Sequence, residues 1–330
     1  MPNSFSSSCV AAIVVTYFPR EDLLRRVLGG LSAQVDQLYV IDNTPRVLPA
    51  VTEAAAVANP SWLSASWLDQ FGTASWPTQF YPQGKNLGIA TAQNIGIAKA
   101  LANGCTDFLF FDQDSAPPDQ LCQHLFTARE QLEAAGTQVG MIGPIIVDEK
   151  TGEHSPIIQS GKYWVKGVSY DTFPDEPIST EYIISSGSLI SAQAIKIVGP
   201  MLDCLFIDWV DVEWGLRAQK FGMRNFVLPT CIMKHSIGDD YVRVGKKVIN
   251  THSDVRNFFI VRNASYLVFH ESFKLAWKIT VFAKLPLYIL FFTASAHGPK
   301  WRAFKNLMRA FCDGLLAIMG PAPAYLFSKK

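Results

Sequence analysis

The sequence predicts an α/β fold, with a mostly parallel sheet whose strands are joined by crossover helices. Two short runs of β-branched and apolar residues, at 10–15 and 38–41, are typical of buried strands. Between them, leucine and valine recur at helical spacing from Leu23 to Leu31. Such an alternation of strand, helix and strand favours parallel strands with helices packed on the sheet.

The remaining elements continue this alternation. We expect a helix followed by a loop at 59–82, helices at 92–100, 118–135 and 253–270, strands at 139–146, 182–190 and 225–228, and an irregular insertion or hairpin at 150–180. A glycine-containing loop at 84–90 precedes the helix at 92–100, so the first amides of this helix could face a phosphate. An ordinary turn and packed helix is the alternative, because the loop lacks P-loop and dinucleotide-binding spacing.

Two carboxylates follow a strongly apolar strand at 108–111, and a Pro-Pro pair ends this strand. Ligands of open α/β sheets bind beyond the carboxyl ends of the strands. Asp112 and Asp114 therefore have the position and the hard oxygen atoms needed to hold Mg²⁺ or Mn²⁺ on a diphosphate. The alternative for a lone Asp-x-Asp pattern is a solvated turn.

A second acidic pair opens a helix predicted from residue 206. Asp208 and Asp211 are three residues apart and share a face if the segment is helical throughout. They are either chemically active or simply first-turn acids favoured by the helix dipole.

Three basic or titratable side chains follow. His235, after the strand at 225–228, is either a loop residue or a third metal ligand or phosphate contact. Arg256 and Arg262 lie on the helix at 253–270 and are either structural or phosphate-binding.

Composition separates the C-terminal end from the rest of the chain. The 330 residues are 49% hydrophobic and carry a formal charge of +1, but residues 271–330 carry +7 and the other residues −6. A basic, aromatic-rich end indicates an anionic partner. The six cysteines form no CxxC pair, and residues 1–9 do not form a convincing signal peptide, so we expect reduced thiols and a cytoplasmic location.

Two apolar helices are expected in this basic end. The run at 279–296 is marginal in length for a bilayer span and contains Lys284 and Pro286. The following helix carries an apolar stripe interleaved with basic residues: Trp301, Phe304, Met308, Phe311 and Leu315. A basic amphipathic helix lies on a membrane surface or packs on a partner, whereas core packing within the same domain is the alternative.

At this point an ordered set of motifs resembles a known family. The motifs are Val15-Thr16-Tyr17, Ile41-Asp42-Asn43, Asn86-Leu87-Gly88-Ile89-Ala90 with Asn94-Ile95-Gly96, Asp112-Gln113-Asp114-Ser115, Gly187-Ser188-Leu189-Ile190, Phe206-Ile207-Asp208-Trp209-Val210-Asp211-Val212-Glu213-Trp214 with Arg217, and His235-Ser236-Ile237-Gly238. Over residues 10–265 this set is similar to the family 2 inverting glycosyltransferases of GT-A fold. The acidic motifs are similar to those of bacterial rhamnosyltransferases that build cell-surface polysaccharide.

The resemblance implies a nucleotide-sugar donor site. Thr16, Tyr17 and Asp42 would line the nucleotide pocket, with Asp42 accepting a hydrogen bond from the pyrimidine ring. The loop beside the ribose and diphosphate would be shaped by three further residues, namely Asn86, Gly88 and Asn94.

The resemblance also implies the reacting groups. Asp112 would face the ribose or the sugar, and Asp114 and His235 would hold Mg²⁺ or Mn²⁺. Asp211 matches the catalytic base of the family. Members of the family often have adjacent acids here, whereas Val210 precedes Asp211 in this chain, so Asp208 is a second candidate for a share in this role.

The expected function is transfer of L-rhamnose from dTDP-β-L-rhamnose to a cell-surface polysaccharide or lipid-linked glycan. Another donor, UDP-hexose or UDP-galactofuranose, and a non-catalytic sugar-nucleotide-binding scaffold are the alternatives. We expect a catalytic domain at 1–265 and a membrane-associating helical region at 266–330. The protein would then be peripheral on the inner face of the cell membrane, with no nucleic-acid partner.

Overall fold

The computed structural model describes residues 8–45, 62–72, 76–149, 152–170, 172–235, 240–244, 247–296, 298–323 and 326. Its centre is an eight-stranded sheet of order β3-β2-β1-β4-β9-β5-β10-β8. These strands are β1 (Val10–Thr16), β2 (Gln37–Asp42), β3 (Gln79–Pro82), β4 (Asp107–Asp112), β5 (Val139–Asp148), β8 (Ile178–Thr180), β9 (Leu189–Ser191) and β10 (Arg224–His235). Only β8 and β9 run antiparallel to their neighbours in this sheet, so the predicted mostly parallel α/β fold is confirmed.

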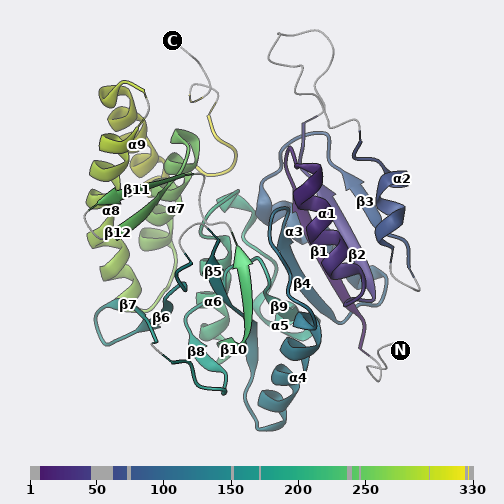
Figure 1. The fold of residues 1–330 in the computed structure, drawn as a ribbon. Coiled ribbons are helices and arrows are strands. Elements are labelled where there is room, and N and C mark those ends of the chain that lie inside the picture. The colour runs from purple at the N-terminus through teal and green to yellow at the C-terminus, as the bar shows by residue number, and fades with distance from the viewer. Residues whose placement is uncertain are drawn as a thin grey trace.

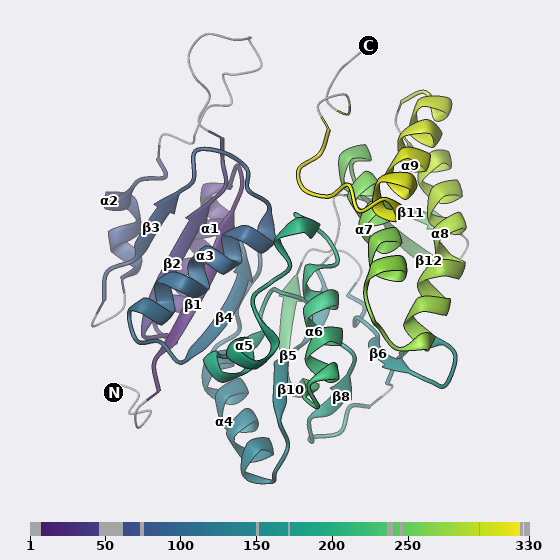
Figure 2. The same cartoon turned by 180° about the vertical axis from the view of Figure 1, so that it is seen from behind.

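Helices cover both faces of this sheet (Figures 1 and 2). One face carries α1 (Glu21–Ser32) and α4 (Leu121–Ala134), and the other carries α3 (Ile89–Ala102), α5 (Ala192–Val198) and α6 (Val210–Lys220). The period of a strand explains this division, because successive side chains of β1 point to opposite faces. Ala11 and Ile13 belong to the core on the α3 side, whereas Val10, Ala12 and Val14 belong to the core on the α1 side.

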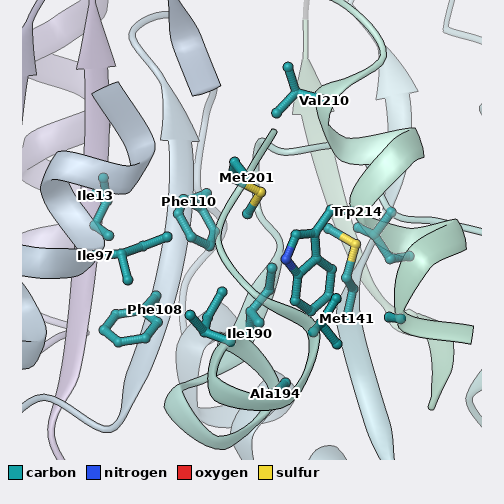
Figure 3. Close-up of a cluster of buried hydrophobic side chains, with 14 of the residues drawn as sticks. Ile13, Ile97, Phe108, Phe110, Met141, Ile190, Ala194, Met201, Val210 and Trp214 are labelled. Carbon is teal, nitrogen blue, oxygen red and sulfur yellow. The ribbon is translucent and has the colours of Figure 1, made fainter. Parts of the chain in front are cut away.

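The core on the α3 side joins the two halves of the sheet. Phe108 and Phe110 of β4 lie between Ile97 of α3 and Trp214 of α6 (Figure 3). Full burial of one large apolar side chain contributes about 1.5–3 kcal/mol, so this cluster stabilises the arrangement strongly. It fixes the end of β4 relative to the start of α6.

Two sequence predictions in this sheet are wrong. The loop expected before residue 82 contains β3, which follows the short helices α2 (Ala65–Leu68) and η2 (Asp69–Phe71) and pairs in parallel with β2. Its sequence shows little strand pattern because it lies at a sheet edge, where Pro82 is tolerated. The strand expected at 182–190 is reduced to β9, because Gly187, with φ of +83°, and a Ser188 N–H bond to the carbonyl of Ser185 bend the chain first.

The C-terminal part is helical, as predicted. Helices α7 (Asp254–His270), α8 (Leu275–Ser295) and α9 (Lys300–Leu315) pack together, beside the hairpin of β11 (Asp240–Val244) and β12 (Lys247–Thr251) (Figure 1). The predicted hairpin within 150–180 is formed by β6 (Ile157–Ser160) and β7 (Val165–Val168), and β7 contacts α8. The domain boundary proposed at 265 falls within α7.

Candidate active site

A buried hydrogen-bond network surrounds Asp42 where β1 and β2 end. The hydroxyls of Thr16 and Thr44 donate to Asp42 Oδ1 at 2.8 and 2.7 Å, and the Thr44 amide donates to the same oxygen at 3.2 Å. Asp42 is only 1% exposed. These bonds fix the carboxylate, and they leave Oδ2 without a hydrogen-bond partner in the described part of the chain.

The loop before α3 is joined to the segment that carries the second acidic pair. Asn43 Nδ2 donates to the Gly88 carbonyl at 3.0 Å, and the Gly88 amide donates to Asn86 Oδ1 at 2.9 Å. Gly88 has φ of +83°, and a Cβ atom there would lie 2.5 Å from the Phe206 carbonyl oxygen. That same oxygen accepts the Ile89 amide at 2.6 Å. The first amide of α3 is therefore bound to the protein, and only later amides are left for a phosphate.

Tyr17 joins the ends of β1 and β4. Its amide donates to Gln113 Oε1 at 2.7 Å, and Gln113 Nε2 donates back to the Tyr17 carbonyl at 3.1 Å. Because both bonds use the Tyr17 backbone, the aromatic ring is free to face solvent and is exposed. A planar ring in this position can stack on a nucleotide base.

Asn94 lies within α3 and not on the loop that precedes it. Its Nδ2 donates to the Met201 carbonyl at 2.9 Å and to Asp203 Oδ1 at 2.6 Å, and its Oδ1 accepts the Met201 amide at 2.9 Å. Asp203 begins the 3₁₀ helix η3 (Asp203–Leu205). Asn94 thus connects α3 through hydrogen bonds to the segment that precedes the second acidic pair.

Asp112 and Asp114 lie at the carboxyl end of β4, as predicted, and both are partly exposed. The Asp112 amide donates to the hydroxyl of Ser186 at 3.2 Å. Nearby, Ala116 forms an antiparallel bridge with Lys234, which brings the backbone at the end of β10 beside this turn.

The predicted third ligand, His235, follows Lys234 directly, but its side chain is outside the described residues. Among the side chains that are described, no group of three His, Cys, Asp or Glu residues is arranged to hold a metal ion. The donor chemistry still fits Mg²⁺ or Mn²⁺, because the Asp112 and Asp114 carboxylates supply the oxygen atoms that these ions prefer.

The prediction that Asp208 and Asp211 share one helical face is wrong. Phe206, Asp208 and Trp209 have left-handed φ values of 67°, 60° and 67°, and α6 begins only at Val210. Asn263 Nδ2 holds this bent segment by donating to the carbonyls of residues 205, 207 and 208 at 2.9, 2.8 and 3.1 Å. Left-handed non-glycine residues persist only where surrounding contacts impose them, and they concentrate at functional sites.

The two arginines of α7 have distinct partners. Arg256 Nε donates to Asp208 Oδ1 at 3.0 Å, so Asp208 is ion-paired. Arg262 is buried, donates to the carbonyls of Gly320 and Leu205, and lies over the Phe259 ring at 4.7 Å. For Arg262 the structural alternative therefore holds.

Asp211 has a strongly perturbed carboxylate. Its Oδ1 accepts the Val212 amide at 2.8 Å and its Oδ2 accepts the Ser185 amide at 3.1 Å. Burial raises the pKa of Asp211 to about 6 against the lowering effect of these two bonds, and the negative charges of Asp112 and Asp208 raise it further. Asp112, from the first acidic pair, therefore lies close enough to Asp211 to influence its charge, and Asp211 is suited to accept a proton near neutral pH.

Some residues of the site were not singled out from the sequence. Asn43 and Thr44 follow Asp42 directly, and Gln113 lies between Asp112 and Asp114. All three are polar residues at the carboxyl end of a strand, where ligands of open α/β sheets bind, so this position could have identified them. Ser185 was not singled out, because it binds Asp211 over a long sequence separation and no local pattern signals it. Arg256 was noted in the sequence, but no local pattern signals its pairing with Asp208.

Comparison with solved structures identifies the fold of the protein. The fold is similar to that of GalNAc-T7 crystallised with UDP, GalNAc and Mn²⁺, with a TM-score of 0.59 and 13% identity. This match covers 95% of the chain but only 57% of GalNAc-T7. S. aureus TarS 1–349 with UDP-GlcNAc gives a TM-score of 0.53 at 12% identity, over 93% of the chain and 81% of TarS. The chain therefore has the GT-A fold of these two glycosyltransferases, as the resemblance of the motifs implied.

Comparison with curated proteins gives a more specific relative. The chain is 29% identical over 316 residues to the dTDP-rhamnosyl transferase RfbF of Shigella flexneri. The match covers 95% of this chain and 98% of RfbF. No family model matches the chain.

Proposed function

We propose that the protein transfers L-rhamnose from dTDP-β-L-rhamnose to a hydroxyl of a glycan acceptor, with inversion at the anomeric carbon. The observation that carries this proposal is the position of Asp211, whose pKa near 6 suits a base that works beside the end of β4. The similarity to a dTDP-rhamnosyl transferase over nearly the full length of both chains supports rhamnose as the transferred sugar.

The nucleotide would bind at the ends of β1 and β2. Thr16 and Thr44 hold Asp42 through one oxygen, Oδ1, so its other oxygen is available to accept the N–H of a pyrimidine ring. We assign the exposed ring of Tyr17 to the face of the same base.

The ribose and diphosphate would follow towards α3 and β4. We assign Asn86 and Gly88 to the wall of the site beside the ribose and diphosphate. Asn94 would keep this wall in position. Gly88 lets the loop approach closely, since no side chain fits against Phe206 there. Asp112 would face the ribose or the sugar.

We assign Asp114 and His235 as the protein ligands of one Mg²⁺ or Mn²⁺ ion. The bridge between Ala116 and Lys234 supports this assignment, because it brings the backbone beside His235 to the turn that carries Asp114. When bound, the ion would stabilise the negative charge of the diphosphate leaving group.

Asp211 would remove the proton from the acceptor hydroxyl as its oxygen attacks the anomeric carbon. The bond from this carbon to the diphosphate oxygen breaks on the opposite face, so a β-L-rhamnosyl nucleotide gives an α-L-rhamnoside and the nucleoside diphosphate. Asp208 is less suited to this role, because Arg256 stabilises its ionised form and occupies its oxygens.

The C-terminal helices would place the enzyme on the inner face of the membrane. α9 buries Ala303, Leu307, Ala310 and Gly314, whereas Trp301 remains 74% exposed and Met308 and Leu315 are also exposed. The apolar stripe noted in the sequence is therefore divided: Phe304 and Phe311 pack partly against the core of the C-terminal helices, whereas the other three residues are exposed. Among the described helices only α8 is long and apolar enough to cross a membrane, and 39% of its most apolar window is buried inside the protein.

A panel of nucleotide sugars, tested for nucleotide release with and without EDTA, examines the proposal. We expect turnover of dTDP-β-L-rhamnose that EDTA abolishes. Preferred turnover of UDP-galactofuranose or UDP-glucose would identify a different donor. Binding of dTDP without turnover, in the presence of membrane acceptors, would identify a scaffold.

A further inference from the structure

One face of helix α1 contacts the turn that follows β4 and carries Asp114. Arg26 and Gly30 are four residues apart on α1, so they lie on the same face of the helix. Gln34 lies just beyond the end of α1 and donates to the Gly30 carbonyl at 2.7 Å. These residues reach three positions of the turn, namely Asp114, Pro117 and Pro118.

We propose that this face of α1 positions the metal-binding turn, and that Arg26 is a positioning residue that acts through the backbone of Asp114. This inference rests on the proposed function, which assigns Asp114 as a ligand of Mg²⁺ or Mn²⁺. It adds the groups that hold this ligand in place. Replacement of a group that orients a metal ligand typically weakens metal binding by about 10- to 100-fold.

Arg26 holds the backbone of the turn directly. Its Nη2 donates to the Asp114 carbonyl at 2.6 Å, and its Nη1 donates to Glu149 Oε1 at 3.2 Å. Glu149 follows β5 directly, so the guanidinium joins the turn after β4 to the end of another strand. Because a guanidinium presents its donors in a rigid planar fork, it fixes the distance between the two groups that it binds.

Gly30 allows the turn to approach α1 closely. A Cβ atom at Gly30 would lie 2.7 Å from Pro117 Cγ and 3.4 Å from the Pro117 carbonyl oxygen. Gln34 Nε2 donates to the Pro118 carbonyl at 3.0 Å, and Gln34 Oε1 accepts the Cys122 amide at 3.2 Å. The turn is therefore held against α1 as far as the start of α4.

A second segment holds the turn and also contacts the proposed base. Ser115 is buried, and its hydroxyl oxygen lies 2.5 Å from that of Ser186. The preceding residue, Ser185, donates its amide to Asp211. The residues of a binding site must keep their positions to within about 0.5 Å, so the contacts of the turn decide whether its carboxylate can bind a metal ion.

Charge alone predicts the opposite effect of replacing Arg26. Removal of this cation would leave Glu149 without this partner, and the uncompensated negative charge would strengthen the binding of a divalent cation. Loss of positioning would weaken it. The side chains of this ion pair are 38% and 30% exposed, so the loss of the pair should change the stability of the fold little. The sign of the change in metal affinity therefore separates the two explanations.

The test compares two pairs of adjacent residues on α1. Arg26→Ala and Gly30→Ala change the face that contacts the turn, whereas Arg25→Ala and Gly29→Ala change the neighbouring face. Arg25 donates to Glu21 instead, and a Cβ atom at Gly29 would meet nothing within 4 Å. Calorimetric titration of Mn²⁺ into each full-length protein saturated with dTDP measures the metal affinity without turnover.

We expect Arg26→Ala to weaken Mn²⁺ binding by about 10-fold or more, and Arg26→Lys, which keeps a charged donor, to weaken it less. Gly30→Ala should also weaken Mn²⁺ binding, because the new methyl group displaces the turn. The two control variants should bind Mn²⁺ as the unchanged protein does, and Gly29→Ala should melt at a higher temperature because alanine favours a helix. Binding of dTDP in EDTA should be the same in all these variants.

The outcomes distinguish this inference from the proposed function. Unchanged or tighter Mn²⁺ binding by Arg26→Ala, whatever its melting temperature, overturns the inference alone. Equal weakening in Arg26→Ala and Arg25→Ala also overturns it, because the effect would then belong to α1 as a whole. An unchanged protein that binds dTDP but shows no Mn²⁺ binding in the complex overturns the metal assignment of the proposed function, and this inference with it.

Discussion

Arg256 Nε lies 3.0 Å from Asp208 Oδ1, and this ion pair distinguishes two carboxylates that are only three residues apart. Asp208 faces a cation, whereas Asp211 accepts two backbone amides and lies near the negative charges of Asp112 and Asp208. The first environment stabilises the negative charge of a carboxylate, and the second favours a group that exchanges a proton near neutral pH.

Replacement of Asp211 should separate chemistry from binding. Asp211→Asn is nearly isosteric but cannot accept the proton, so we expect a fall in kcat of about 10²–10⁴-fold with dTDP affinity retained. Steady-state kinetics and calorimetry measure the two effects. Asp208→Asn is the matched control, and a larger loss of turnover in this variant would assign the base to Asp208.

The same substitution should stabilise the protein at neutral pH. The folded-state pKa of Asp211 lies above its ordinary value of 3.8, so ionisation of this group opposes folding. Its contribution to the free energy of unfolding is present at low pH, falls as the pH rises towards 6, and is constant above that. We expect Asp211→Asn to raise the free energy of unfolding by up to about 3 kcal/mol at pH 7 and by little at pH 4. The loss of one amide hydrogen bond in the variant reduces this gain at both pH values. Denaturant unfolding at both pH values measures this, and an equal difference at both would contradict it.

Turnover should rise with pH through the pKa of Asp211. Because only the ionised carboxylate can accept the acceptor proton, kcat/KM should fall about tenfold per pH unit below pH 6. A pH profile of acceptor-dependent nucleotide release measures this. A profile that stays flat between pH 5 and 7 would show that Asp211 is not the base.

Metal removal should affect donor binding as well as turnover. Asp114→Asn and His235→Ala should each weaken activity by about 10- to 100-fold. Titration of Mn²⁺ into the dTDP complex gives a readout that does not depend on turnover. Full activity in EDTA, in protein shown to contain no metal, would exclude the assignment.

Gly88 should tolerate no side chain. In Gly88→Ala the new Cβ would lie 2.5 Å from the Phe206 carbonyl oxygen, in addition to the penalty for φ of +83°. Gly104→Ala is the matched control, because Gly104 has φ of +82° but no atom near its Cβ position. We expect both to lose about 1 kcal/mol from backbone strain, and Gly88→Ala to lose further stability and dTDP affinity. Equal melting temperatures for the two variants would contradict the close packing.

Membrane association should depend on the exposed face of α9. Trp301→Glu combined with Met308→Glu adds charge to two exposed positions and removes little packing, so we expect weaker flotation with anionic liposomes and an unchanged melting temperature. Phe221→Glu, an exposed position in the sheet-containing part, is the control and should float as the unchanged protein does. Equal flotation of all three proteins would show that α9 does not contact lipid.

The sequence predicted most of the sheet because its central strands are buried on both faces and therefore form continuous apolar runs, such as 108–111. It failed at β3, where an edge position relaxes this requirement. It also failed at Asp208, whose left-handed backbone is imposed by Asn263, 55 residues further along the chain. The acidic residues could be proposed from the sequence because chemistry restricts their type, whereas the ion pair of Asp208 with Arg256 depends on tertiary contacts alone.

The contact of Gly88 and Ile89 with Phe206 has a consequence for attempts to redesign the enzyme. The Phe206 carbonyl accepts the Ile89 amide at the end of the loop at 84–90, and Phe206 also begins the bend that leads to Asp211. In a chimera that takes only residues 84–90 from a relative with another sugar preference, the new loop would not fit against the bend of this protein. We expect chimeras to remain active only when residues 84–90 and 201–212 are exchanged together.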